Sequence, residues 1–390
     1  MHSSVCNFDS IIALIKGKYN DRKLLIWGAW EIGWELAEAF RENNLELYAY
    51  VDSNHYGEDY KGYSVISPDV LDENNRSEYY LIVSLVEHAS VYKALEDKQW
   101  KEFEDFIYLG KTVLLTSCKN YQDVYGNRIE SKISKNLEIK MACGSRLVIE
   151  EGVQIGKNVR IEAMMLSEIW IRKGVVIPDN SYIRGNCKGQ IIIGSWCHFG
   201  SNLCIDVSSN GKIELDSKCH FERDCFMEIY SDGVIMIDKQ CEFGAGAILR
   251  ACYGGKIRIG SQSTFGNDTI IRIFHASTFE CGSDCMFSYC TRIRGEDGHA
   301  IIDMKNHKIM ERKKNVKLGN HVWVGMGATI FPGTEMGDNS IVGANSLVNH
   351  SFPANCIVIG TPARIHKTDV TWDRNAEITY EEWEKGQKNV

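Results

Sequence analysis

A 22-residue repeat limits this 390-residue chain to very few folds. Each copy carries an apolar residue, a small or acidic one, two free positions and a small one. Because such a short unit cannot bury its apolar side alone, the repeat predicts a stack of equivalent coils. The copies are GQIIIGSWCHFG from Gly189, GKIELDSKCHFE from Gly211, GVIMIDKQCEFG from Gly233, GKIRIGSQSTFG from Gly255 and STFECGSDCMFS from Ser277.

The same six-residue pattern recurs outside this series, at Ile155, Leu318, Val324, Met336 and Val342. We expect its aliphatic side chain to point into a prism of stacked coils, with Gly, Asp or Asn adopting positive φ at the corners. Three strands of six residues make one coil. Because the period of 22 exceeds three sixes by four, we expect one corner per coil to carry a slightly longer loop.

Two columns of equivalent side chains follow from the period. We expect the cysteine column to pack in the core as small hydrophobes. A metal site on Cys281 and Cys285 is the alternative, and we expect no metal. The phenylalanine column predicts a ladder of stacked rings. The columns are Cys197, Cys219, Cys241 and Cys285, and Phe199, Phe221, Phe243, Phe265 and Phe287.

Residues 1–116 follow a different pattern. The apolar runs KLLIWG, ELYAYVDSN and YYLIVSL alternate with amphipathic segments such as EIGWELAEAFREN. Strands alternating with helices predict a small Rossmann-like parallel sheet, in which Asp52 stands where a ribose-binding carboxylate would lie. Residues 117–140 are polar and predict a connector. We expect residues 368–390 to form a tail that caps the exposed end of the stack.

Composition narrows the classes of function. The 44 basic and 52 acidic residues give a net charge of −8, which disfavours nucleic acid as a partner. No run of apolar residues reaches the length of a membrane span. The start of the sequence does not resemble a secretory signal, so we expect the 14 cysteines to be reduced thiols in a cytoplasmic protein.

Two segments carry a resemblance to a known family. VKLGNHVWVGMGATIFPGTEMGDNSIVGANSLVNHSFPANCIVIGTPARIHK, residues 316–367, resembles the closing coils of hexapeptide-repeat acyltransferases, which include galactoside, maltose and capsular polysaccharide O-acetyltransferases. RIRGEDGHAIID, from Arg292, is similar to the DGH loop of the sugar O-acetyltransferases. The resemblance implies a left-handed parallel β-helix over 141–367, acetyl-CoA as acetyl donor and a homotrimer. The expected fold is therefore mainly β, with this helix preceded by a small Rossmann-like α/β domain.

The resemblance also implies catalytic residues, in a loop over residues 292–317. The family's general-base histidine lies 24 residues before the tryptophan of a VWVG-type turn, the spacing of His299 and Trp323 here. A base is needed because a sugar hydroxyl is a weak nucleophile toward a thioester. Asp297 is expected to orient His299, with Glu296 and Asp303 as competing carboxylates. Trp323 is expected to form a flat wall near the thioester or acceptor, or to pack at a corner.

For acetyl-CoA, the resemblance implies contacts spread over the last coils. Arginine and lysine side chains suit the phosphates of the donor. Asn349 and His350 stand where the family usually has Thr-Lys, so one lysine expected to contact a phosphate is absent. The basic run from Lys305 to Lys317 predicts either a solvated face or an attraction for an anionic acceptor, with Lys313 and Lys314 as its centre. The predicted donor contacts are Trp323, Met326, Ala344, Asn349, His350, Arg364 and Lys367.

The favoured hypothesis is an acetyl-CoA-dependent O-acetyltransferase that modifies a sugar hydroxyl of a capsular or other surface polysaccharide, directly and without a covalent enzyme intermediate. One alternative is an acetyltransferase acting on a nucleotide-activated sugar, for which the N-terminal domain would bind the nucleotide. The other is a non-catalytic β-helical scaffold. The acceptor sugar, the hydroxyl modified and a ligand of the N-terminal domain stay open.

Overall fold

The computed structural model confirms a mainly β chain, with a small α/β region before a parallel β-helix. Contacts divide the chain into two compact units, residues 1–214 with 229–232, and residues 215–228 with 233–390. This division falls inside the repeats and not at the predicted connector. The described residues are 8–28, 31–84, 89–110, 112–117, 120–132, 136–142, 144–310 and 315–387.

The first unit begins with a six-stranded sheet in the order β3-β4-β2-β1-β5-β6. Strand β1 is parallel to β2 and β5, and alternate residues of β1 enter two separate cores, Leu24 one and Leu25 the other. Both faces of the sheet are therefore covered, as in other parallel sheets. The elements are α1 (Asp9–Lys16), β1 (Lys23–Trp27), α2 (Glu31–Glu42), β2 (Leu47–Val51), β3 (Asp59–Tyr60), β4 (Tyr63–Ile66), the 3₁₀ turn η1 (Pro68–Val70), β5 (Tyr79–Val83), α3 (Ala89–Asp97) and β6 (Phe106–Tyr108).

The segment expected to be a connector contributes strands to the β-helix. Strand β8 is antiparallel to β9, β9 is parallel to β11, and β7 is antiparallel to β10. The polar residues of this segment complete hydrogen bonds at the first coils: Asn127 accepts from Leu147 N–H at 2.7 Å and binds Asp123. The strands here are β7 (Val113–Leu115), β8 (Tyr121–Gln122), β9 (Arg128–Ile129), β10 (Leu137–Met141) and β11 (Arg146–Ile149).

The remaining strands of the first unit form the coils that follow. Neighbouring coils are parallel and in register at the repeat spacing, with Leu137 opposite Val159 and Arg184 opposite Asp206. These strands are β12 (Gln154–Ile155), β13 (Val159–Ala163), β14 (Glu168–Ile171), β15 (Val176–Ile177), β16 (Tyr182–Gly185), β17 (Gln190–Ile193), β18 (His198–Phe199) and β19 (Cys204–Val207), while β20 (Lys212–Leu215) and β22 (Phe226–Tyr230) have residues in both units.

The second unit has three faces, each a parallel sheet. The first face contains β25-β28-β31-β36-β39, the second β23-β26-β29-β34-β37, and the third β21-β24-β27-β30-β35-β38-β40, to which β41 adds antiparallel. Their bounds are β21 (His220–Phe221), β23 (Val234–Ile237), β24 (Glu242–Phe243), β25 (Ile248–Cys252), β26 (Lys256–Ile259), β27 (Thr264–Phe265), β28 (Ile270–Phe274), β29 (Thr278–Cys281), β30 (Met286–Phe287), β31 (Arg292–Arg294), β34 (Val316–Leu318), β35 (Trp323–Val324), β36 (Thr329–Ile330), β37 (Glu335–Met336), β38 (Ile341–Val342), β39 (Leu347–Val348), β40 (Cys356–Gly360) and β41 (Ala363–Thr368).

The expectation of a longer loop at one corner of each 22-residue coil is wrong. In the 22-residue coil of β17, β18 and β19, two strands have four residues and one has two. In the 18-residue coil of β36, β37 and β38, every strand has two residues. The four extra residues therefore lengthen two strands by two each. Because side chains alternate along a strand, adding two residues leaves the inward-facing set unchanged.

Both predicted columns lie in the core. Phe221, Phe243, Phe265 and Phe287 stack in sequence with ring centroids 4.6, 4.6 and 4.4 Å apart. The thiols of Cys219, Cys241 and Cys285 each lie 3.2 Å from a backbone carbonyl oxygen to which they can donate. Cys197 is also buried. These contacts agree with the packing role predicted for the cysteines.

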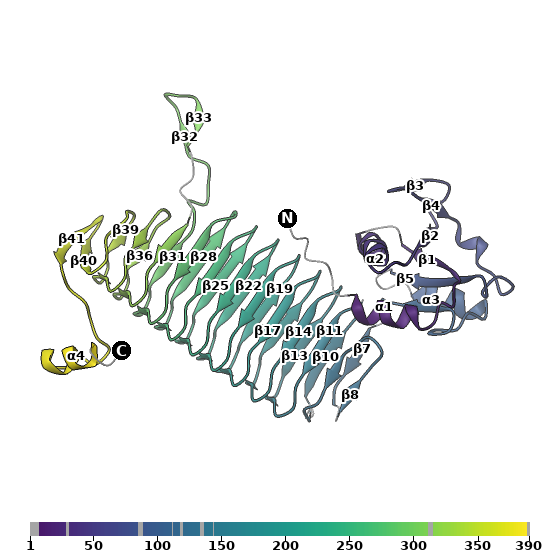
Figure 1. Ribbon diagram of the computed structural model, residues 1–390, viewed down its shortest axis with the longest axis horizontal. Coiled ribbons are helices and arrows are strands. Elements are labelled where there is room, and N and C mark those ends of the chain that lie inside the picture. Colours follow the sequence, from purple (N-terminus) through teal and green to yellow (C-terminus); the bar gives the residue numbers. More distant parts are fainter. Residues whose placement is uncertain are drawn as a thin grey trace. The chain divides into compact units, whose positions relative to one another are not determined.

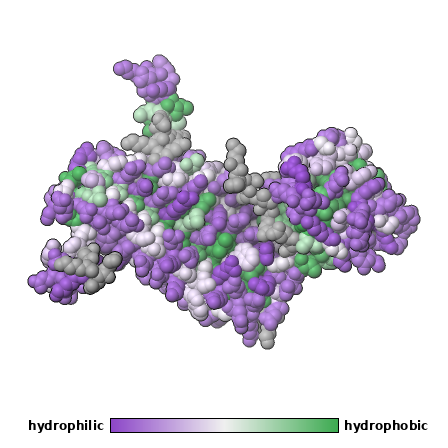
Figure 2. All heavy atoms as spheres, in the orientation of Figure 1, coloured by the Kyte–Doolittle hydropathy of each residue, from purple (hydrophilic) through white to green (hydrophobic). Residues whose placement is uncertain are grey.

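An arm interrupts the coils between β31 and β34, which is where the sequence predicts a loop. Phe279 of β29 lies opposite Val316 of β34, a separation of 37 residues along the chain. The arm, residues 295–310, carries an antiparallel hairpin of β32 (Ile302–Asp303) and β33 (Lys308–Ile309) that extends away from the coils (Figure 1). In Figure 2 its tip is hydrophilic and a hydrophobic zone lies nearer the coils.

The C-terminal segment lies along the third face and does not cap the end of the stack. After Thr368 the chain turns back, and Arg374 binds Gln262, Thr264 and Cys285, several coils before the last one. The helix α4 (Tyr380–Gln387) follows. Across the described parts of the chain, none of the helices has the length and apolar character needed to cross a membrane.

Candidate active site

His299 is exposed on the arm, five residues after β31 ends. The turn that precedes it depends on Gly298, which has φ +82° and donates its N–H to Glu296 Oε2 at 2.7 Å. Glu296 is 7% exposed, whereas Asp297 is exposed. Glu296 therefore binds the backbone of the turn that precedes His299. The orientation of His299 by Asp297 stays a prediction.

Asp303, the third carboxylate considered for His299, belongs to the hairpin turn of the arm. It accepts hydrogen bonds from the backbone N–H groups of Lys305 and Asn306 and from the Asn306 side chain, at 2.7 to 3.0 Å. These bonds, above all those from Asn306, hold the pKa of Asp303 below its ordinary value. Asp303 therefore stabilises the hairpin of the arm, and its carboxylate already accepts hydrogen bonds there.

Trp323 begins β35 on the third face and is partly exposed. Its Nε1 donates to Ser288 Oγ at 3.2 Å, and its ring lies 6.0 Å from that of Trp372 at an angle of 49°. Met286 and Ile341 stand beside it in register on the neighbouring coils. Trp323 therefore packs on its neighbours and stays partly exposed, and a wall near the thioester or acceptor stays a prediction.

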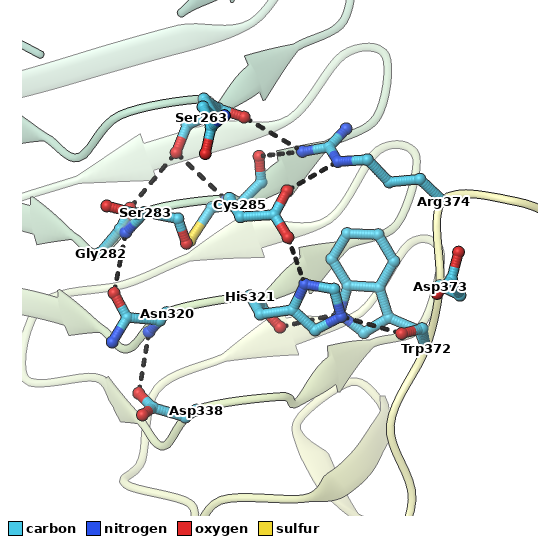
Figure 3. A network of polar contacts seen from close by, with 12 residues as sticks. Ser263, Gly282, Ser283, Cys285, Asn320, His321, Asp338, Trp372, Asp373 and Arg374 are labelled. Carbon is cyan, nitrogen blue, oxygen red and sulfur yellow. Dashed lines mark hydrogen bonds and ion pairs between the residues drawn. The ribbon is translucent and has the colours of Figure 1, made fainter. Parts of the chain in front are cut away.

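A polar network that the sequence did not indicate holds Trp372 in place (Figure 3). His321 Nδ1 lies 2.6 Å from Asp284 Oδ2, and His321 Nε2 lies 2.8 Å from the carbonyl oxygen of Trp372. The two rings stack at 4.0 Å, and Trp372 Nε1 donates back to the His321 carbonyl at 2.8 Å. Both ring nitrogens of His321 therefore face oxygen atoms.

Arg374 completes this network by donating to Asp284 Oδ1 at 2.7 Å. We call residues 369–374 the C-terminal strap, because they join the third face through these contacts. His321 and Asp284 occupy the same corner of successive coils. An alignment of the repeats before and after the arm would therefore have placed them at the same position. The strap itself gives no such signal, because its residues lie outside the repeats.

The residues predicted to bind acetyl-CoA lie at two corners and on strands of the third face. Met326 and Ala344 occupy successive corners between the third and first faces, where Asn345 N–H donates to the Met326 carbonyl at 2.8 Å. Arg364 is opposite Ile359 on β40, and both Arg364 and Lys367 are exposed. Lys367 continues the line of Trp323 through Ile341 and Ile357.

Asn349 and His350 stand apart from that group. They follow β39 and so lie at the corner between the first and second faces, the corner from which the arm leaves. The side chains of these two residues contact each other. Lys313 and Lys314, predicted to meet the acceptor, lie outside the described residues.

The structure does not bring His299 and Trp323 together within one chain. His299 is on the arm, between the first and second faces, and Trp323 is on the third face. The corner between the first and second faces lies on a different side of the prism from the third face.

The coils carry a six-residue repeat, and comparisons with known proteins find the same feature. Residues 315–350 match the family model described as bacterial transferase hexapeptide (six repeats), which confirms the predicted resemblance. The chain is similar to the galactoside O-acetyltransferase of Escherichia coli K12, with 42% identity over 50 residues that cover 13% of this chain and 25% of that protein. It is also similar to the polysialic acid O-acetyltransferase of Escherichia coli O1:K1, with 33% identity over 82 residues, 21% of this chain and 27% of that protein.

The chain therefore spans about a quarter of the length of these curated relatives. Among solved structures, that of the polysialic-acid-specific acetyltransferase NeuO aligns with 61% of this chain and 92% of its own, at 19% identity and a TM-score of 0.42.

Proposed function

We propose that the protein is an acetyl-CoA-dependent O-acetyltransferase that modifies a sugar hydroxyl of a capsular or other surface polysaccharide. The observation that carries this proposal is His299, held by a glycine turn on an arm that projects from hexapeptide coils, 24 residues before Trp323. The names of the similar proteins, both O-acetyltransferases of sugars, support the same reaction. The exposed position of His299 excludes a packing role in the core of this chain.

In the proposed mechanism, His299 removes the proton of the acceptor hydroxyl while the oxygen attacks the thioester carbonyl of acetyl-CoA. The carbon–sulfur bond then breaks, the coenzyme leaves as a thiolate, and the imidazolium returns the proton to that sulfur. No covalent enzyme intermediate is needed, because a thiolate is a good leaving group. Arg364 and Lys367 offer exposed cations to the phosphates of the donor.

The assembly that we propose is a homotrimer. His299 and Trp323 lie on different sides of one prism, so the arm of one subunit would meet the third face of the next. Cyclic closure repeats the same site at each interface. The proposed compartment is the cytoplasm, which contains acetyl-CoA, and the cysteines that the structure describes are in the thiol form.

A polymer is favoured over a nucleotide-activated sugar as acceptor. In the α/β region, the carboxylate of Asp52 accepts from the backbone N–H groups of Asn54 and His55 at 2.8 and 3.2 Å and is 7% exposed. The carboxylate that stands where a ribose-binding group would lie is thus engaged by its own turn.

Replacing His299 by alanine tests the proposed function. We expect kcat for acetyl transfer to fall by about 10²–10⁴-fold, the usual contribution of a general base, with the oligomer intact by light scattering. His307→Ala is the matched control, because His307 is also an exposed histidine of the arm but lies in the hairpin turn. Wild-type turnover in the His299 variant would contradict the role of this residue.

A further inference from the structure

Three arginines stand in line on the outer surface of the first face. Arg250 is opposite Arg272, and Arg272 is opposite Arg294, on the successive strands β25, β28 and β31. Their neighbours along each strand point inward and are buried, for example Ile271 and Ile273. Because adjacent strands are about 4.8 Å apart, the three side chains form a ladder of positive charge.

This ladder is short of acidic partners. Like charges opposite each other on a sheet are destabilising, and Glu228 offers one carboxylate, with Oε2 at 3.0 Å from Arg250 Nε. Within the described ranges, no ion pair is formed by Arg272 or Arg294, and Arg272 Nε is buried without a hydrogen-bond partner. Buried polar groups normally have partners, so these positions point to an anion from outside the chain.

The same position of the repeat shows which anion fits. Arg184, three repeats before Arg250 in the sequence, binds Asp206 of the next coil through Nε and Nη2, at 2.9 and 2.6 Å. This bidentate geometry is the one that guanidinium and carboxylate groups prefer. At Arg272 and Arg294 the carboxylate of the next coil is missing, and a carboxylate of a ligand can replace it.

Aromatic rings border the ladder at the corner beside it. Tyr253 follows Arg250 by three residues, His275 follows Arg272 by three, and their rings stack at 5.2 Å with an interplanar angle of 4°. Tyr253 is 49% exposed. Ring faces of this kind accept the apolar face of a sugar, so aromatic surface lies beside the cations on this side of the unit.

The ladder ends at the proposed catalytic arm. A Cβ atom built on Gly298 would lie 3.9 Å from Nη2 of Arg294, and His299 is the next residue. We propose that Arg250, Arg272 and Arg294, with Tyr253 and His275, form a binding track for a polysaccharide that carries a carboxylate on its sugars. This inference rests on the proposed function and specifies its acceptor: a polyanionic glycan whose chain passes His299.

Direct binding tests the track without any need for turnover. The probes are fluorescently labelled polysialic acid and polygalacturonate, both polycarboxylates, with neutral dextran and dextran sulfate as comparisons. In Arg272→Gln we expect Kd for the polycarboxylates to rise about tenfold, the usual effect of losing one charge-assisted hydrogen bond. Raising the salt concentration should weaken wild-type binding and affect the variant less, because exposed charges are screened.

Arg258→Gln is the matched control. Arg258 is on β26 of the second face, opposite Glu280, and forms an ion pair with it at 3.4 Å. We expect this variant to bind the polymers as the wild type does. Thermal unfolding should show that Arg272→Gln is folded, and polysialic acid should raise the melting temperature of the wild type more than that of the variant.

The outcomes separate this inference from the proposed function. An unchanged Kd in Arg272→Gln would overturn the track, even if the enzyme acetylates a neutral sugar. Binding of dextran sulfate without binding of either polycarboxylate would overturn the carboxylate assignment. Conversely, polycarboxylate binding that is weakened in Arg272→Gln, in a protein that transfers acetyl groups to no acceptor, would support the track and contradict the proposed function.

Discussion

Buried thiols show what a single residue contributes to the coils. Cys225 is 1% exposed and its Sγ lies 3.5 Å from the Gly244 carbonyl oxygen. Burial raises the pKa of Cys225 to about 12 and also raises that of Cys281. The folded chain therefore keeps these protons at a pH where an unfolded chain, with thiol pKa of about 8.5, has lost them.

A pH-dependent stability follows for Cys225. The pKa of Cys225 is higher in the folded chain than in the unfolded chain, so Cys225 contributes fully to the free energy of unfolding below about pH 8.5. This contribution declines as the pH rises toward 12 and is smaller by about 2 kcal/mol at pH 10. Cys225→Ala should lower the free energy of unfolding at pH 8, and this loss should shrink by about 2 kcal/mol at pH 10. Urea unfolding at both pH values measures it. The exposed Cys290, replaced in the same way, serves as control; equal losses for Cys225→Ala at both values would contradict the argument.

Among the elements, the C-terminal strap has the clearest consequence for the site. Trp372 is 7% exposed, stacks on His321 and stands beside Trp323. The described residues of the strap contain no strand, so these side-chain contacts and one backbone hydrogen bond, from Val370 N–H to the Asn355 carbonyl oxygen, hold it. Local opening of such a segment is independent of the coils.

Trp372→Ala should therefore release the strap and leave the β-helix folded. We expect trypsin to cleave after Arg374 at least about tenfold faster than in the wild type, because cleavage follows the population of the open form. Trp383→Ala is the control, since Trp383 lies in α4, outside the strap, and its ring contacts that of Tyr380. A large fall in the melting temperature of the whole unit, with no change in cleavage, would show that Trp372 supports the coils instead.

For the whole molecule, the sequence predicts what the repeat determines and, from its alternating apolar runs, the small α/β region before it. The coils, the phenylalanine ladder and the position of the arm follow from a period that is visible in the chain. The same period would have revealed Arg250, Arg272 and Arg294, which are 22 residues apart. The strap could not be predicted, because Arg374 meets Asp284 across 90 residues through a path that no repeat fixes. The lengthened strands were missed because a period gives the size of a coil and not where its extra residues lie.

The separation of His299 from Trp323 on the prism leads to a test at the level of the assembly. If each site takes its histidine from one subunit and its tryptophan from the next, His299→Ala and Trp323→Ala chains should complement each other. Co-expression with two different affinity tags yields mixed oligomers, and in random trimers about one site in four would contain both wild-type side chains. We expect acetyl transfer to return to about that fraction of the wild-type rate. Co-expressing His299→Ala with the double variant is the control, because no site then contains the histidine. Absence of recovery in mixed oligomers, or a monomeric mass with full activity by light scattering, would show that one chain forms the site alone.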